Sequence, residues 1–257
     1  MFGSEVISAA EAAVKKKELL KSSWTRYLIA AILAGIFIGF GILLMSVIGG
    51  TLSSVNAPAA KLVNGAAFAV ALSILIMAGG ELFTGNNLIM AVGVLEKKVS
   101  LGDCLKVWAM AYMGNLIGSM VLSAVFKATG LINDGVQAFI LSSASAKMSL
   151  TIPQLLTRGI LCNILVCIAV WCSIKLKSES AKLIIIFWCI FAFVTCGFEH
   201  SVANMTMLSL SLMLPHNTGV SIGGMAYNLL FVTIGNILGG VSVGAAYWFI
   251  SRGKSKQ

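Results

Sequence analysis

The hydrophobic positions of the chain form six long apolar stretches that are separated by short polar segments. A helix needs about 20 apolar residues to cross the hydrocarbon core of a bilayer. The stretches cover residues 27–49, 62–95, 107–126, 159–174, 183–214 and 219–250. Three of them exceed one straight span, and the second and fifth contain charged residues and glycines near their middles. We therefore predict an all-α membrane protein with six transmembrane helices, of which the second and fifth are interrupted.

Composition supports a lipid environment and argues against a nucleic-acid partner. Hydrophobic residues make up 58% of the 257 positions and charged residues only 11%, whereas soluble domains carry about a quarter charged residues. The net charge is +9, but the Lys and Arg residues flank the apolar stretches and form no basic face of a soluble domain. The chain therefore has the lipid bilayer as a partner, and we expect no nucleic acid.

The positive residues predict the orientation in the membrane. Fourteen of the eighteen fall on one side, and only Lys61, Lys127, Lys147 and Arg158 fall on the other. The fourteen are Lys15, Lys16, Lys17, Lys21, Arg26, Lys97, Lys98, Lys106, Lys175, Lys177, Lys182, Arg252, Lys254 and Lys256. Cytoplasmic segments carry an excess of Lys and Arg, so we expect both termini in the cytoplasm. An even number of spans agrees with this, because it places both termini on the same side.

The segment before the first span does not resemble a cleavable signal peptide, because it has charges where an apolar core is needed. Its apolar residues recur at helical spacing, which predicts an amphipathic helix on the membrane surface; a solvated charged tail is the alternative. We thus divide the chain into a cytoplasmic amphipathic helix over 1–26, a six-span channel domain over 27–251 and a cytoplasmic tail over 252–257.

Two short motifs recur in the second half of the chain. Glu81 and Asn86 in the second span match Glu199 and Asn204 in the fifth. Gly-Asn-x-x-Gly begins at Gly114 in the third span and is repeated in the sixth at residues 235–239, with two apolar residues between. Each half holds three spans, so the second half enters the membrane inverted. Inverted repeats commonly place a solute site between the halves near the midplane, on interrupted helices.

Glycines four residues apart favour close helix packing and not chemistry. The pairs are Gly35 and Gly39, Gly114 and Gly118, Gly235 and Gly239, and Gly240 and Gly244.

Three ionisable residues lie deep in apolar spans: Glu81, Glu199 and His200. A charge at the bilayer centre costs at least about 2.5–3.5 kcal/mol, so such groups face a cavity or a partner. For the two glutamates we favour a structural role, either protonated or as acceptors for backbone N–H groups that the helix breaks leave free. His200 has no counterpart in the first half, where Leu82 occupies the matching place, and we predict a functional role for it.

Thr84 with Gly85, and Ser201, have the residue types that begin helices: a hydroxyl can cap free N–H groups and glycine permits a break. Two half-helices would then direct positive N-terminal ends toward the midplane, which favours an anion. Lys147 and Arg158 would add attraction at the outer mouth, although ordinary loop solvation also explains them.

Apolar rings usually narrow such a pore. The candidates are Phe68, Leu72 and Leu82 on the second span, with Phe193 and Phe198 on the fifth; lipid-facing or core positions are the alternative. The six cysteines contain no Cys-x-x-Cys pair, so we interpret them as small hydrophobic residues and expect neither a metal site nor a cofactor.

The motif residues resemble the formate/nitrite transporter family. The segments that carry the resemblance are Glu81-Leu82-Phe83-Thr84-Gly85, Glu199-His200-Ser201-Val202-Ala203-Asn204-Met205 and Ala146-Lys147. The likeness covers almost the whole chain. It implies a homopentamer of aquaporin-like protomers in a bacterial inner membrane, each with a pore for formate, nitrite, hydrosulfide or a related small anion. The residues after each break resemble nitrite- and hydrosulfide-type members more than formate-type ones.

The resemblance also implies roles for individual residues. His200 would lie between two constrictions, with Thr84 opposite it and Asn163 nearby. Lys147 would lie in the outer vestibule, and Glu199 would orient the central region. The inner constriction would comprise Leu72 and Leu82, and the outer one Phe68 and Phe193.

From these features we expect a channel for small anions of weak acids in which the anion gains a proton near His200. A proton-coupled secondary transporter with alternating access fits the repeat equally well. A pore for a neutral solute such as water or glycerol is a further alternative. A membrane enzyme that uses His200, Glu199 and a cysteine is disfavoured, because the other histidine, His216, follows Pro215 at the end of the fifth span and no metal-ligand spacing appears.

Overall fold

The computed structural model describes residues 1–52, 55, 57–215 and 219–252, and every regular element in these ranges is a helix. His216, Lys254 and Lys256 lie outside the described residues. The helices are α1 (Gly3–Ser22), α2 (Trp24–Leu52), α3 (Ala57–Ala78), α4 (Phe83–Leu95), α5 (Leu101–Ala128), α6 (Asp134–Met148), α7 (Ile152–Lys175), α8 (Glu179–Cys196), α9 (Ser201–Met213) and α10 (Ile222–Ser251).

Six of the described helices are long and apolar enough to cross a membrane: α2, α3, α5, α7, α8 and α10. The second predicted span consists of α3 and the half-helix α4, and the fifth of α8 and the half-helix α9. The prediction of six transmembrane helices with interrupted second and fifth spans is therefore confirmed.

The helices pack as two copies of one five-helix unit. α2 packs on α5 as α7 packs on α10, and α1 contacts α4 as α6 contacts α9. The unit includes α6, which begins after its N-cap Asn133 and is a helix that we did not predict. α6 is the counterpart of α1, and α3 meets α8 where the two copies join.

Glycines allow the close approach of α2 to α5 and of α7 to α10. A Cβ on Gly118 would collide with the carbonyl oxygen of Ile32, and a Cβ on Gly239 with that of Ile160. Because no side chain fits there, these glycines act in helix packing, as their spacing predicts.

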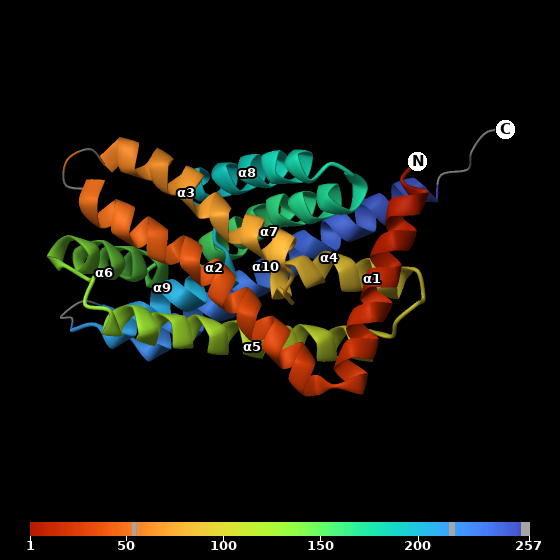
Figure 1. Ribbon diagram of the computed structural model, residues 1–257, viewed down its shortest axis with the longest axis horizontal. Coiled ribbons are helices and arrows are strands. Elements are labelled where there is room, and N and C mark those ends of the chain that lie inside the picture. The colour runs from red at the N-terminus through yellow and green to blue at the C-terminus, as the bar shows by residue number, and fades with distance from the viewer. Residues whose placement is uncertain (53–54, 56, 216–218, 253–257) are drawn as a thin grey trace.

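α1 crosses the ends of the spans at one end of the molecule (Figure 1). The N-terminus, the end of α10 and the turns from α4 to α5 and from α7 to α8 lie at that end, whereas α6 lies at the other. α1 packs through Val6, Ala9, Ala10 and Ala13, all of which are buried. Residues 3–22 therefore form a helix with one buried apolar face, and not a solvated tail.

Candidate functional site

The two helix breaks lie at equivalent places in the repeat. The chain leaves α3 through Gly79, with φ +87°, and leaves α8 through Gly197, with φ +77°. Only glycine adopts these angles without strain. The prediction that Gly85 permits the first break is wrong, because Gly85 lies inside α4. The N-terminal ends of α4 and α9 both begin at these central breaks.

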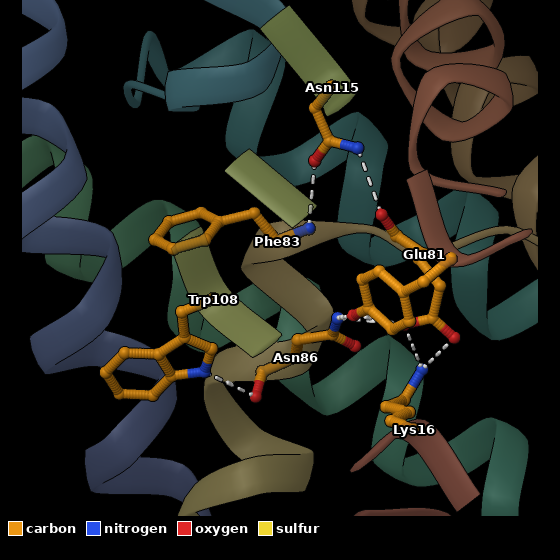
Figure 2. Close-up of polar contacts among 7 residues, drawn as sticks. Lys16, Glu81, Phe83, Asn86, Trp108 and Asn115 are labelled. Carbon is orange, nitrogen blue, oxygen red and sulfur yellow. Dashed lines mark hydrogen bonds and ion pairs between the residues drawn. The ribbon is translucent and has the colours of Figure 1, made fainter. Parts of the chain in front are cut away.

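One asparagine from the Gly-Asn-x-x-Gly motif supports each break. Asn115 Oδ1 accepts from the backbone N–H of Phe83, and its Nδ2 donates to the carbonyls of Glu81 and Ala31 (Figure 2). Asn236 Oδ1 accepts from Ser201 N–H in the same way, and its Nδ2 donates to the carbonyls of Glu199 and Gly159. Each asparagine thus pairs with one N–H and one carbonyl at its break, and its third bond, to Ala31 of α2 or Gly159 of α7, ties the break to a neighbouring helix.

The supporting role of these asparagines was missed from the sequence, where the motif served as evidence for the repeat and its glycines were assigned to packing. The signal was present, because a polar residue recurs between the paired glycines of both halves.

Neither predicted hydroxyl cap forms. The N-cap of α4 is Leu82, which makes no side-chain cap bond, and the N-cap of α9 is His200. The ring nitrogen Nδ1 of His200 accepts from the backbone N–H of Ala203 at 3.1 Å. α4 begins at Phe83 and α9 at Ser201, so Thr84 and Ser201 lie inside these helices and not at the N-cap positions.

The cap determines how His200 presents its other nitrogen. A ring nitrogen that accepts a hydrogen bond carries no proton, so the neutral imidazole has its hydrogen on Nε2. Nε2 lies 3.0 Å from Thr84 Oγ1, across the centre of the molecule from α9 to α4. Both side chains are buried. A second proton on Nδ1 would break the bond to Ala203, so the geometry favours the neutral imidazole as a donor.

A cavity of about 110 Å³ reaches from α6 to His200. The Phe68 and Phe193 rings lie edge to face at 5.9 Å, and Phe193 also stacks on the His200 ring at 5.9 Å. The lining residues are Ile42, Met45, Phe68, Phe139, Ser143, Lys147, Phe193, Val194, Gly197, Phe198, Glu199, His200, Ala203, Asn204 and Met207. The cavity therefore joins the predicted lysine, all three of the predicted phenylalanines (Phe68, Phe193 and Phe198) and the histidine.

Glu199 is tied to this cavity by an ion pair. Lys147 Nζ lies 2.9 and 3.0 Å from its two carboxylate oxygens, and Asn204 donates to one of them at 2.6 Å. Asn204 also donates to Asn228, whose own amide donates to the carbonyl of Lys147. The four polar residues form a closed set in which every charge has a partner.

Glu81 has an equivalent set on the side of α1. Lys16 Nζ lies 2.8 Å from both carboxylate oxygens, and Tyr27 Oη and Asn86 Nδ2 donate to one of them (Figure 2). Trp108 Nε1 donates to the Asn86 carbonyl and orients the start of α4. The partners differ from the loose backbone N–H groups that we expected, since each carboxylate accepts from a lysine and an asparagine side chain.

Sequence spacing gave no sign of the partners Lys16 and Tyr27, because Lys16 lies in a run of three lysines that the orientation rule already explains. The repeat did offer one indirect signal. If Lys147 pairs with Glu199, an inverted repeat predicts an equivalent lysine for Glu81.

Asn163 lies behind Thr84 and does not bond to His200. Its Nδ2 donates to the carbonyls of Thr84 and Asn236 and to Asn87 Oδ1. Leu72 and Leu82 are buried, at 2% and 3% exposure, on α3 and at the break. Among the described residues, no three His, Cys, Asp or Glu side chains are grouped so that they could hold a metal ion.

A protein-family model described as "Formate/nitrite transporter" matches residues 4–249, nearly the entire chain. The chain belongs to the formate/nitrite transporter family. The matched range contains the whole site. It includes the starts of both half-helices, both lysine–glutamate pairs and the central histidine.

Relatives of known name are similar over most of their length. The "Nitrite transporter NirC" of Salmonella typhimurium is 36% identical over 251 residues, which is 97% of this chain and 92% of that one. A solved "FNT family ion channel" is 33% identical with a TM-score of 0.92, and the match covers 97% of this chain and 99% of that one. A "Pentameric formate channel with formate bound" is 29% identical with a TM-score of 0.79, over 90% and 98% of the two chains. The aquaporin-like helical fold and the family membership are thereby shown.

Proposed function

We propose that the protein is a membrane channel for small monovalent anions of weak acids: nitrite, hydrosulfide or formate. Relatives named for nitrite and for formate support this class of solute. The half-helices α4 and α9 begin at the centre, where their N-terminal ends favour negative charge. Lys147 on one side and Lys16 on the other attract anions toward both ends of the path.

The observation that carries the proposal is the position of His200. It is 4% exposed, it forms part of the inner wall of the cavity that Lys147 lines, and its Nε2 points to Thr84. When an anion enters, the Nε2–H of His200 can turn from Thr84 Oγ1 to the anion and replace one of its waters. A hydrogen bond to a charged group contributes about 1.5–3 kcal/mol.

The proposed passage begins on the side of Lys147. The anion enters beside Lys147, loses water between Phe68 and Phe193, and accepts a hydrogen bond from His200. Because the bond to Ala203 keeps His200 neutral, the proton that converts the anion to its acid comes from a hydronium ion of the vestibule, which is left as water. The neutral acid then passes Leu72 and Leu82, where an ion would carry a large desolvation cost. It releases its proton on the side of Lys16.

The assembly and placement that we propose follow the family. We propose a homopentamer in which each protomer has its own pore, and the similarity to the solved pentameric formate channel supports this. The clustering of Lys and Arg at the end of the molecule where α1 lies supports cytoplasmic termini in a bacterial inner membrane. Within this arrangement residues 1–26 cover the cytoplasmic face, 27–251 form the channel and 252–257 are a tail.

The test is flux into proteoliposomes. Formate, nitrite, hydrosulfide and glycerol are compared at two pH values with the unaltered protein, His200→Leu and His200→Asn. We expect anion flux that rises as pH falls, with glycerol excluded. His200→Leu removes the donor and lowers flux about 100-fold, which corresponds to about 3 kcal/mol of lost hydrogen bonding. An asparagine can accept from Ala203 and donate to the anion, so His200→Asn retains flux within about tenfold.

Three outcomes would change the proposal. Unchanged rate and pH dependence in His200→Leu would remove the histidine from the mechanism. Loss of both the flux and its pH dependence in His200→Asn would show that the imidazole itself carries the proton. Uphill accumulation driven by a pH step would indicate a proton-coupled secondary transporter, and glycerol flux without anion flux a pore for neutral solutes.

A further inference from the structure

The three consecutive lysines of α1 point in different directions. Lys16 reaches inward to Glu81. Lys17 instead faces α5, where its Nζ lies 3.7 Å from Asp103 Oδ2. Here α1 and α5 enclose an open groove of about 470 Å³, lined by Lys17, Leu20, Lys21, Asp103, Lys106 and Val107. The groove is distinct from the pore, because none of these residues lines the cavity beside His200.

The charges of the groove do not balance. Three lysines line the groove, and Asp103 is the only carboxylate among its lining residues. Lys17 Nζ also lies 3.8 Å from Glu18 Oε1, whose side chain is exposed outside the groove. Asp103 Oδ2 is already engaged, since it accepts from both the backbone N–H and the hydroxyl of Ser100 at the start of α5. Among the described residues, neither Lys21 nor Lys106 has an ion-pair partner. Such a groove is complementary to an anion with more than one oxygen acceptor.

Its surroundings are those of a membrane interface. Trp24, at the start of α2, is 59% exposed, and tryptophan is enriched where lipid meets water. Further along α5 from Lys106, the exposed residues Met113, Ile117 and Met120 follow on the same face at helical spacing. Leu20 and Val107 form an apolar part of the groove itself. A polar anion and an attached acyl chain therefore both find matching surface.

We propose that this groove binds the phosphate headgroup of an anionic phospholipid, with one acyl chain along the exposed face of α5. Lys17, Lys21 and Lys106 contact the phosphate, and Asp103 disfavours a second negative charge deeper in the groove. Lys17 adjoins Lys16 in α1. A phosphate bound to Lys17 therefore also restrains the segment of α1 from which Lys16 reaches Glu81.

The experiment uses the purified full-length protein after removal of lipid. Native mass spectrometry and the thermal unfolding midpoint report binding of phosphatidylglycerol, phosphatidylcholine and inorganic phosphate. The test variant is Lys17→Gln with Lys21→Gln and Lys106→Gln. The control, Lys15→Gln with Lys98→Gln and Lys177→Gln, removes the same charge at the same end of the molecule but outside the groove. Lys106→Glu, at an exposed position without an ion-pair partner among the described residues, serves if the triple variant folds poorly.

We expect preferential retention of phosphatidylglycerol, weakened about fivefold for each lysine removed and about 100-fold in the triple variant. The control should stay within about twofold, and Lys106→Glu should weaken binding by at least about fivefold. Equal loss in the test and control variants would overturn the proposal in favour of general surface charge. Stabilisation by inorganic phosphate as strong as that by phosphatidylglycerol would overturn the lipid assignment. Neither readout involves flux, so the result is independent of the proposed transport function.

Discussion

The two halves of the molecule use the same frame and differ at its centre. Asn115 and Asn236 support the two breaks with identical bonds, and Lys16–Glu81 repeats as Lys147–Glu199. At the cap position, however, the first half has Leu82, which makes no side-chain bond, and the second has His200, which does. The recurring asparagines support the broken helices, whereas His200, which has no counterpart, caps α9 and lines the cavity.

A second difference lies in how the two glutamates are held. Glu81 accepts from Lys16, Tyr27 and Asn86, whereas Glu199 accepts from Lys147 and Asn204. Glu199 is also the more buried of the two, with 4% of its side chain exposed against 12% for Glu81. The half that contains the histidine thus has fewer donors for a more deeply placed carboxylate, and it depends more on its lysine.

The largest effect is expected from removing a break-supporting asparagine. Asn115→Leu or Asn236→Leu removes the side-chain partner of one N–H and one carbonyl at a buried break, and each lowers the free energy of unfolding by about 3 kcal/mol or more. The two variants should have equal effects, as measured by unfolding in detergent followed by circular dichroism. Ser119→Ala is the matched control, because this buried hydroxyl has no partner among the described residues. An effect no larger than that of the control would refute the role.

The next effect concerns the glycine crossings that the halves share. Gly118→Ala and Gly239→Ala force a methyl group against the carbonyl oxygen of Ile32 or Ile160, so each should lower the free energy of unfolding by about 1–3 kcal/mol. Gly223→Ala, where a Cβ meets no atom within 4 Å, should be neutral or slightly stabilising in the same assay. If all three variants unfold alike, helix approach does not depend on these glycines.

A smaller effect sharpens the difference between the glutamates. Lys147→Gln leaves Glu199 with one donor residue, and Lys16→Gln leaves Glu81 with two. We expect losses in the free energy of unfolding of about 2 kcal/mol and about 1 kcal/mol, respectively. A double-mutant cycle with Glu199→Gln and Glu81→Gln measures each coupling directly. Equal couplings would contradict the inequality that the donor sets predict.

The smallest effect involves Glu96, outside the spans and without a counterpart in the second half. Arg252 donates to its carboxylate at 2.7 Å, with Trp248 as a second donor, and holds the pKa of Glu96 below its usual value. A carboxyl group with a lowered folded-state pKa stabilises the fold above its unfolded pKa near 4.5, and this contribution is lost as pH falls through the folded value. Glu96→Gln should therefore reduce the loss in the free energy of unfolding below about pH 4.5, by well under 1 kcal/mol. The measurement is the unfolding midpoint as a function of pH. An identical pH profile in both proteins would exclude the contribution.

Several features of the site could be anticipated only in part. The lack of a counterpart predicted a functional role for His200, and its position against Phe193 in the cavity that Lys147 lines agrees with the family resemblance. The cap positions could not be anticipated, because a serine, threonine or histidine near a break has similar capping ability in isolation. Which one caps depends on the residue at which the chain turns, and the positive φ of Gly79 and Gly197 sets that residue.

The sequence by itself determined the number of spans, the interruptions and the inverted repeat. Lipid accepts only apolar segments with paired backbone groups, so hydrophobicity and its interruptions report directly on membrane architecture. Only the tertiary structure decided the partners: Lys16 lies 65 residues from Glu81, and Thr84 lies 116 residues from His200. Such pairs depend on where helices cross and which faces they turn to one another, and no local pattern along the chain encodes a distance between segments that far apart.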